Sequence, residues 1–301
     1  MKLKKIVALV SSAILAFSLV GCSIEGEESS GESTGNGSIG FSVSTLNNPF
    51  FVTLSQGAKD KAKEQGVDLI VVDAGDDAAK QTSDIEDLIS KNISVLIVNP
   101  VDSDAVAPAV KDAIAKGIKV ISVDRGVNGV DVDCAIASDN VEGAKMATEY
   151  LVSLIGKDAK VVELEGTSGA SATIDRGAGF HEVADKQLNV VSKQTANFNR
   201  SEGMTVMENM LQSNSDIKGV FAHNDEMALG AVEAIGSRNI AVVGFDSTDD
   251  ALAAIKKGKM VATVAQKPDL MGATAVETAV KIINGETVEK TIPVEVELVT
   301  K

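Results

Sequence analysis

Short apolar runs alternate with longer amphipathic segments along most of the chain. The segments 51–65, 141–155, 202–211 and 270–284 place their apolar residues at helical spacing. Strands that alternate with helices in this way predict βαβ units and parallel sheets. Ten apolar runs are predicted to be strands: 39–44, 69–73, 95–99, 119–124, 134–138, 160–165, 190–194, 219–223, 240–246 and 261–266.

The number of predicted strands favours two α/β lobes over one wide sheet. Ten strands exceed what one doubly wound sheet comfortably holds, and no second low-complexity linker interrupts the chain. We therefore expect two lobes with parallel sheets, joined by short crossovers. The composition agrees, because 44% of residues are hydrophobic but only 3% are aromatic. A core of Val, Ile, Ala and Leu is typical of buried parallel sheets.

The first residues resemble a bacterial export signal. Three lysines within residues 1–5 precede an apolar stretch over 6–20, which is too short to span a bilayer comfortably. We interpret residues 1–21 as a signal peptide. The sequence Leu-Val-Gly-Cys at 19–22 resembles the lipobox, in which the cysteine receives diacylglycerol, so Cys22 is the predicted lipidation site. The alternative is an uncleaved anchor helix in which Cys22 is incidental.

A polar segment follows Cys22. Residues 23–38, SIEGEESSGESTGNGS, carry almost no apolar side chain and cannot offset their chain entropy by burial. We interpret residues 22–38 as the lipidated cysteine and a flexible tether, with a root-mean-square span of roughly 22 Å. The expected location is extracytoplasmic, lipid-anchored to the outer face of the cell membrane.

Charge and motif content exclude several classes of function. With 28 Lys and Arg against 43 Asp and Glu, the net charge of −15 disfavours nucleic acids and anionic membrane surfaces, so we expect membrane contact through the lipid alone. The two cysteines and two histidines are too few for a Cys-rich or His-rich zinc site, and no C-x-x-C occurs. No G-x-x-x-x-G-K-[ST], H-E-x-x-H or G-x-S-x-G motif occurs. We expect no catalytic residue, no metal and no cofactor, and interpret GTSGAS at 166–171 as a tight turn.

Polar residues stand where many of the predicted strands end. In open parallel sheets, ligands bind outside the carboxyl ends of the strands. Two lobes that face each other would therefore enclose a polar small molecule. The alternative is that polar residues end strands only because loops are exposed. The residues in question are Ser44, Asp73, Asn99, Asp124, Ser138, Asn224, Asp246 and Gln266.

The residue types at these ends suit a sugar. Asp124 beside Arg125 sets a charged acceptor next to a charged donor, and Asp246 with Arg176 could repeat the pair from the other lobe. Amides at Asn48, Asn99, Asn224 and Gln266 both donate and accept. Phe50, Phe51, Phe198 and Phe245 would offer ring faces to an apolar C–H surface. The alternatives are a strand-end salt bridge for Asp124 and Arg125, and core filling for the rings.

Eight motifs carry a resemblance to a known family. In order and spacing, the chain from about residue 39 to its end resembles the ribose-binding proteins of bacterial ABC importers, the sugar-binding type within the periplasmic-binding-protein family. The motifs are STLNNPFF at 44–51, NPVDSDAV at 99–106, VDRG at 123–126, ASDN at 137–140, DRGAGF at 175–180, NDEMALGA at 224–231, VVGFD at 242–246 and VAQKPDLMG at 264–272.

The resemblance implies a fold, a ligand and a partner. It implies the type I fold, with two Rossmann-like lobes joined by a three-stranded hinge: lobe 1 at 39–138 plus 267–293, and lobe 2 at 139–266 plus 294–301. It also implies a monomer that closes on D-ribose and delivers it to a membrane permease. Carried over position by position, the sugar contacts would be Ser44, Asn48, Phe50, Phe51, Asn99, Asp124, Arg125, Arg176, Phe198, Asn224, Phe245, Asp246 and Gln266.

Two positions depart from the family pattern, and three alternative functions stay open. Ile174 stands where the family has arginine, and His223 replaces a glutamine, and neither residue is among the sugar contacts carried over. Another monosaccharide, such as xylose, galactose or allose, is the nearest alternative. Sugar-responsive repressors share the two-lobed core but begin with a DNA-binding helix-turn-helix. A secreted glycosidase would use Asp124 and Asp246 as its carboxylate pair.

Overall fold

A computed structural model describes residues 37–301. The predicted signal peptide, Cys22 and all of the tether but its last two residues lie outside the described residues. None of the helices within 37–301 combines the length and apolar content needed to cross a membrane. The same residues contain no group of His, Cys, Asp and Glu side chains that could hold a metal ion.

The first sheet contains six strands in the order β11-β5-β4-β3-β1-β2, and all its neighbours pair in parallel. Alternate residues of a strand face opposite sides of the sheet. Val95 and Ile97 therefore pack under one helix pair and Leu96 and Val98 under the other. The strands are β1 (Ile39–Val43), β2 (Leu69–Asp73), β3 (Val95–Val98), β4 (Lys119–Val123), β5 (Cys134–Ser138) and β11 (Thr291–Val294).

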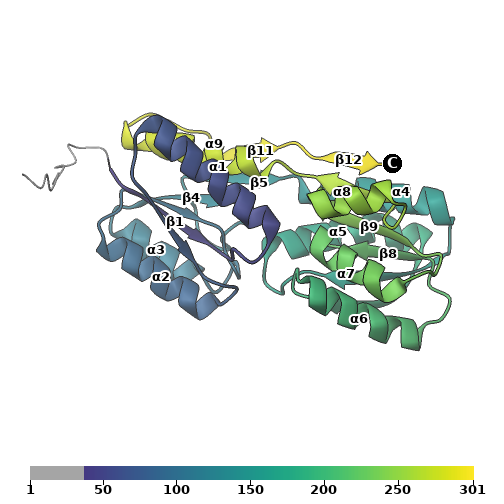
Figure 1. Ribbon diagram of the computed structural model, residues 1–301. Coiled ribbons are helices and arrows are strands. Elements are labelled where there is room, and N and C mark those ends of the chain that lie inside the picture. The colour runs from purple at the N-terminus through teal and green to yellow at the C-terminus, as the bar shows by residue number, and fades with distance from the viewer. Residues whose placement is uncertain (1–36) are drawn as a thin grey trace, which may run out of the picture. The chain divides into compact units, whose positions relative to one another are not determined.

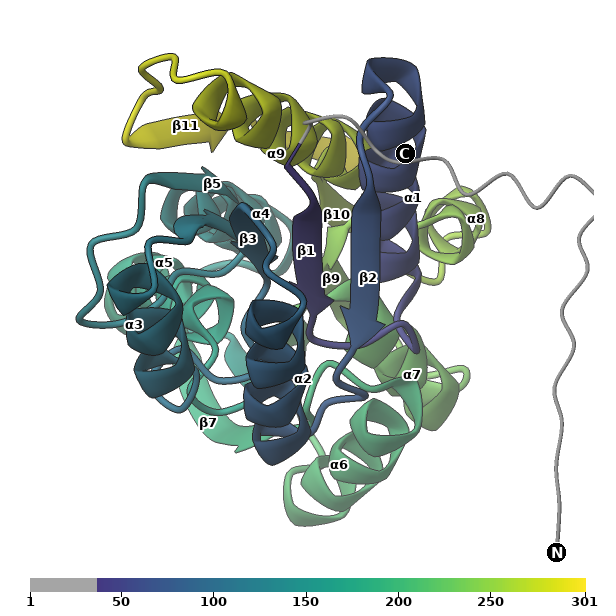
Figure 2. The same ribbon diagram turned by 90° about the vertical axis from the view of Figure 1, so that its left-hand side faces the viewer.

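Two pairs of helices cover the first sheet. α1 and α9 lie against each other on one face, while α2 and α3 cover the other (Figure 2). We call this sheet and its helices lobe 1. The helices are α1 (Pro49–Gln65), α2 (Ala78–Ser90), α3 (Ala107–Ala115) and α9 (Pro268–Ile283).

The second sheet also contains six strands, in the order β12-β10-β9-β8-β6-β7. Its last strand, β12, pairs antiparallel with β10, so the expectation of purely parallel sheets is wrong at this edge. Its strands are β6 (Lys160–Glu165), β7 (Asn189–Thr195), β8 (Gly219–Ala222), β9 (Ala241–Asp246), β10 (Ala262–Ala265) and β12 (Glu297–Thr300).

Five helices cover the second sheet, which we call lobe 2 together with them. α4 and α5 pack on one face, and α6, α7 and α8 pack on the other. The helices are α4 (Asn140–Ile155), α5 (Ser171–Gln187), α6 (Arg200–Ser213), α7 (Asp225–Ile235) and α8 (Asp249–Lys256). The α/β fold class with two lobes is thereby confirmed.

The chain crosses between the lobes three times: between β5 and α4, between β10 and α9, and between β11 and β12 (Figure 1). All ten predicted strands are present, with ends within two residues of the expected ones. β11 and β12 were not predicted as separate strands. Each is only four residues long, and Pro293 lies inside β11, where proline argues against a strand.

Lobe 2 also buries an acidic side chain, that of Glu163, which lies within a strand and not at its end. Glu163 of β6 is fully buried, and its two carboxylate oxygens contact Nε2 of His223 at 2.9 Å and Nε2 of His181 at 3.0 Å. The backbone N–H of Gly166 donates to Nδ1 of His223, so the ring proton lies on Nε2 and is donated to Glu163. The second ring nitrogen of His181 contacts Asp185 at 2.8 Å. Two carboxylate partners favour a doubly protonated His181.

We predict that stability falls as the pH rises through the titration of His181. Partial burial opposes its charge, but Asp185 and Glu163 outweigh burial and raise the pKa of His181 above its ordinary value. The stabilisation is therefore complete below about pH 6.5, the pKa in the unfolded chain, and is lost above the raised folded pKa. Urea unfolding between pH 5.5 and 8.5 should show this slope in the native sequence and a shallower one in His181→Gln.

The control is Lys186→Gln, which removes an exposed charge from the same helix. It should keep the native slope. Equal slopes in the native protein and His181→Gln would show that His181 carries no linked proton.

Candidate functional site

A small cavity lies between the two lobes, at the carboxyl ends of their strands. About 240 Å³ of space, part of which is open to solvent, remains among side chains contributed by both sheets and their helices. We call it the interlobe cavity. It is lined by Asn48, Phe50, Phe51, Asp124 and Arg125 from lobe 1, by Ala172, Arg176, Phe198, Asn224 and Asp246 from lobe 2, and by Gln266 from the crossing after β10.

Ten of the thirteen predicted contact residues line this cavity. Ala172 also lines it but was not predicted, because a methyl group carries no chemical signal in the sequence. The one signal in the sequence is its spacing. Ala172 lies four residues before Arg176 on α5, and residues at this spacing share a helix face. The remaining predicted residues, Ser44, Asn99 and Phe245, are buried behind the lining.

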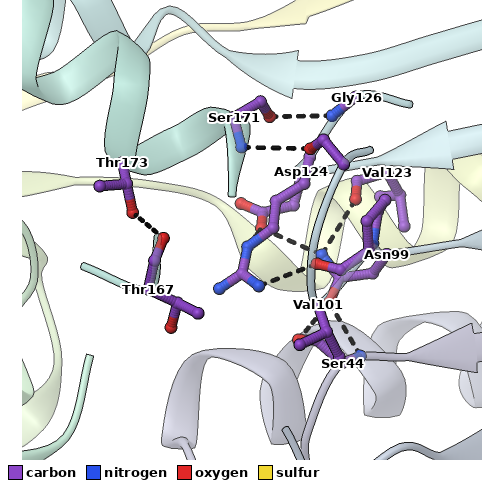
Figure 3. A network of polar contacts seen from close by, with 12 residues as sticks. Ser44, Asn99, Val101, Val123, Asp124, Gly126, Thr167, Ser171 and Thr173 are labelled. Atoms are coloured by element: carbon purple, nitrogen blue, oxygen red, sulfur yellow. Dashed lines mark hydrogen bonds and ion pairs between the residues drawn. The ribbon is translucent and has the colours of Figure 1, made fainter. Parts of the chain in front are cut away.

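Ser44 and Asn99 hold Asp124 in place (Figure 3). The backbone N–H and the hydroxyl of Ser44 donate to Oδ1 of Asn99 at 3.1 and 2.7 Å. Nδ2 of Asn99 then donates to the Asp124 carboxylate at 3.1 Å and to the carbonyl of Val123 at 3.2 Å. A fixed amide therefore sets the direction of the carboxylate at the end of β4.

Asp124 and Arg125 form the charged pair of lobe 1. Asp124 has a φ of 65°, in the left-handed region, and strain of this kind concentrates at functional sites. Nη1 of Arg125 donates to the carbonyl of Pro100 at 2.8 Å, and its Nε lies 3.6 Å from the Asp124 carboxylate. The guanidinium lies 5.0 and 5.2 Å from the ring centroids of Phe51 and Phe198. Rings from both lobes therefore flank one cation.

Arg176 and Asp246 form a looser pair in lobe 2. Nη1 of Arg176 donates to the carbonyl of His223 at 2.6 Å, and Nε donates to Oδ1 of Asn140 at 2.8 Å. The guanidinium lies 3.9 Å from the Phe245 centroid, so this ring supports Arg176 from behind. Nη1 approaches Asp246 to 3.9 Å, which leaves the Asp246 carboxylate free to bind another donor.

The amides of the cavity are oriented by their own helices and strands. Asn48 caps α1, where Pro49 fixes the first helical residue, and accepts from the N–H of Phe50. Asn224 caps α7 and donates to the carbonyl of Phe198 at 3.3 Å. Gln266 donates to Asp246 at 2.8 Å. Capping and pairing thus hold these three amide side chains in place at the cavity.

Burial controls the charges in this cavity. Burial raises the pKa of Asp124 and of Asp246, although Arg125 and Arg176 oppose the shift. Burial also lowers the pKa of Arg125 and of Arg176. Desolvated charges of this kind are costly unless hydrogen bonds replace the lost water.

Two polar atoms of the lining have no hydrogen-bond partner within the described residues: Nε of Arg125, a donor, and Oε1 of Gln266, an acceptor. Buried polar atoms are normally paired. A ligand with hydroxyl groups, which both donate and accept, would match this donor and this acceptor.

Three hydrogen bonds join the lobes beside the cavity. The N–H of Gly126 donates to Oγ of Ser171 at 3.0 Å (Figure 3). The N–H of Ser171 donates to Oγ of Ser103 at 3.2 Å. The N–H of Ser103 donates to the carbonyl of Gly169 at 3.0 Å. The segment 166–171 is therefore where lobe 2 meets lobe 1, a role beyond the tight turn expected from sequence. We call these contacts the interlobe bonds.

The fold and the site together define the class of protein. A family model described as a periplasmic binding protein domain matches residues 39–287. The chain belongs to the periplasmic binding protein family and has its type I fold. Because this is a family of binding proteins, the expectation that the chain is not an enzyme is confirmed.

Similar proteins narrow the class further. The chain is 50% identical to the ribose import binding protein RbsB of Bacillus subtilis, over 99% of this chain and 100% of that protein. It is 44% identical to the ribose import binding protein RbsB of Haemophilus influenzae, over 99% and 100% of the two chains. Among solved structures, the Caulobacter myo-inositol binding protein bound to myo-inositol superposes with a TM-score of 0.85 at 34% identity, covering 89% of this chain and 94% of that one.

Proposed function

We propose that this chain is the extracytoplasmic substrate-binding lipoprotein of an ABC sugar importer and that it binds D-ribose in the interlobe cavity. The observation that carries the proposal is the convergence of ten predicted contact side chains from two lobes on one cavity. The similarity to ribose import binding proteins extends over nearly the whole chain and supports the same ligand.

The chemistry of the lining fits a pentose. Each sugar hydroxyl donates one hydrogen bond and accepts others. Asp124 and Asp246 offer charged acceptors, Arg125 and Arg176 offer charged donors, and the three amides of the cavity supply both. Phe50, Phe51 and Phe198 provide apolar surface for the C–H groups of the ring. We propose that the ten lining residues contact the sugar, while Ser44, Asn99 and Phe245, which the sequence predicted as contacts, act through the residues they hold.

Delivery follows from the two-lobed geometry. A sugar that touches both lobes stabilises the arrangement in which they meet, by its differential affinity for that state. The interlobe bonds belong to the same arrangement, because each has one partner in either lobe. We propose that the permease recognises the closed form. The hinge lies at the three crossings, with lobe 1 at 39–138 plus 267–293 and lobe 2 at 139–266 plus 294–301.

The proposed location rests on the sequence outside the described residues. The lipobox-like Leu-Val-Gly-Cys and the polar segment after it predict a lipid on Cys22 and a tether to the outer face of the membrane. A second candidate ligand is another monosaccharide, such as xylose, galactose or allose. A solved relative of the same fold binds a different polyol, myo-inositol, which keeps this alternative in the test.

We predict that Asp124→Ala and Arg125→Ala each weaken ribose binding at least tenfold. A hydrogen bond to a charged group contributes about 1.5 to 3 kcal/mol, and tenfold corresponds to about 1.4 kcal/mol. Isothermal titration with ribose, xylose, galactose and allose measures both affinity and preference. Asp104→Ala, an exposed carboxylate outside the lining, is the matched control and should bind as the native protein does. Native-like affinity in both cavity variants, or no monosaccharide bound by the native protein, would contradict the proposal.

We predict that Ser171→Ala weakens ribose binding about fivefold, although Ser171 does not line the cavity. Ser171 Oγ accepts the interlobe bond from Gly126, and one such bond is worth about 1 kcal/mol. The loss favours the open arrangement, which X-ray scattering of the ligand-free protein would detect as a larger radius of gyration. Ser153→Ala, an exposed serine of α4, serves as control. Unchanged affinity together with unchanged scattering would show that the interlobe bonds do not affect closure.

We predict that Cys22→Ser releases the protein into the culture medium. The serine oxygen cannot take the place of the thiol that receives diacylglycerol. Incorporation of labelled fatty acid, together with membrane fractionation, measures the effect. Fatty-acid labelling that persists in Cys22→Ser would show that the lipid is attached elsewhere.

A further inference from the structure

A second buried carboxylate lies next to the cavity but does not line it. Asp225, the first residue of α7, is fully buried and directly follows the cavity residue Asn224. No ion pair involves its side chain within residues 37–301. The hydrogen bonds of its carboxylate therefore indicate its role.

All bonds of the Asp225 carboxylate go to the segment that carries Asp246 and to its neighbouring strand. One oxygen accepts from the hydroxyl of Thr263 on β10 at 2.6 Å. The other accepts from the backbone N–H of Thr248 at 2.8 Å and from its hydroxyl at 3.2 Å. Thr263 in turn accepts from the N–H of Ser247 at 3.2 Å. Asp225 thus holds residues 247–248 directly and through Thr263.

The segment that it holds has a strained backbone. Asp246 has a φ of 124° and Ser247 a φ of 61°, values that side-chain-bearing residues rarely adopt. Such conformations persist only where the surroundings fix them. Gly244 makes room for the fixing group, because a Cβ there would lie 2.3 Å from the Asp225 carboxylate. The glycine in β9 therefore leaves the space that the Asp225 carboxylate occupies.

The charged groups around Asp225 come from three elements. Asp246 on β9 and Glu226 on α7 repel its charge, and Arg176 on α5 attracts it. Strand β10 contributes the neutral Thr263. Arg176 is therefore the cation that acts on both Asp225 and Asp246.

We propose that Asp225 is a positioning residue for sugar binding: it fixes the turn 246–248 so that Asp246 faces the cavity, and its charge makes the affinity for the sugar depend on pH. This inference rests on the proposed function. Asp225 touches no ligand and acts through Asp246. The ligand class is a neutral polyol whose hydroxyls donate to the ionised Asp246.

The direction of the pH effect follows from the two neighbouring carboxylates. Burial raises the pKa of Asp225 to about 7 and raises that of Asp246 well above its ordinary value, and each repels the other's charge. The sugar binds Asp246 in its ionised form, so affinity falls as the pH falls. Removing the charge at residue 225 eases ionisation of Asp246, which moves the loss of affinity to lower pH.

The test measures ribose affinity by titration calorimetry between pH 5 and 8.5 in three variants. Asp225→Asn keeps the shape and removes the charge: we expect affinity at pH 8 to fall at least threefold and the midpoint of its pH dependence to fall by more than about half a unit. Thr263→Val keeps both carboxylates and loosens the turn. It should lower affinity while its midpoint stays above that of Asp225→Asn. Glu233→Gln, an exposed charge on the same helix, should change neither quantity.

A second measurement needs no ligand. Because the pKa of Asp225 is raised in the folded protein, its contribution to stability is present below about pH 4 and lost as the pH rises through about 7. The stability of ligand-free Asp225→Asn, measured by urea unfolding, should therefore decline less steeply between about pH 4 and 7 than that of the native protein, and a cooperative transition also shows that the variant folds.

The outcomes separate the two proposals. Native-like affinity of Asp225→Asn and Thr263→Val at pH 8 would overturn the positioning role. A common pH midpoint for the native protein and Asp225→Asn would overturn the charge linkage. Failure of the native protein to bind any monosaccharide at any pH would overturn the proposed function itself, and with it the role of Asp225 in sugar binding.

Discussion

Four ionisable side chains from two lobes are buried around one small cavity, and the rest of the site is arranged to support them. Asp124, Arg125, Arg176 and Asp246 are each less than a tenth exposed. Taking such groups out of water costs several kcal/mol each, which attraction between opposite charges offsets only with good geometry and further hydrogen bonds. Those bonds come from Asn99, Pro100, Asn140, His223 and Gln266. A sugar would supply the hydrogen bonds that are still missing. Ligand binding and closure of the lobes therefore both depend on offsetting the desolvation cost of these four charges.

Parallel-sheet topology explains why much of this could be predicted from the sequence. In both lobes the strands run side by side in one direction, so the residues that end them gather at one edge. Asp124 follows β4 and Asp246 ends β9, and both positions are visible as polar residues closing an apolar run. The alternation of runs and amphipathic segments likewise predicted ten strands and the two lobes. These features depend on local order along the chain, which a sequence displays directly.

The features that could not be predicted depend on how side chains, helices and strands are oriented in the folded protein. Nothing in the sequence distinguishes Asn99, which holds Asp124 from behind, from Asn224, which lines the cavity. Ala172 lines the cavity only because α5 turns that face inward. The interlobe bonds join Ser103 and Ser171, which lie in different lobes and carry no shared signal. β12 pairs antiparallel because the chain leaves β11 through only two residues and continues in the same direction into lobe 2, where the other strands run the opposite way (Figure 1).

The charges of the lining also limit what the cavity can hold. Two carboxylates and two guanidiniums line it, and they balance when all four are ionised. A neutral polyol leaves that balance intact and contributes hydroxyls to atoms such as Nε of Arg125 and Oε1 of Gln266. A sugar phosphate or sugar acid would add a negative charge that no further cation of the lining could match. Since Asp225 already adds a carboxylate close behind, the site has less tolerance for anions than for cations. The arrangement of charge in the lining therefore favours an uncharged polyol over an anion.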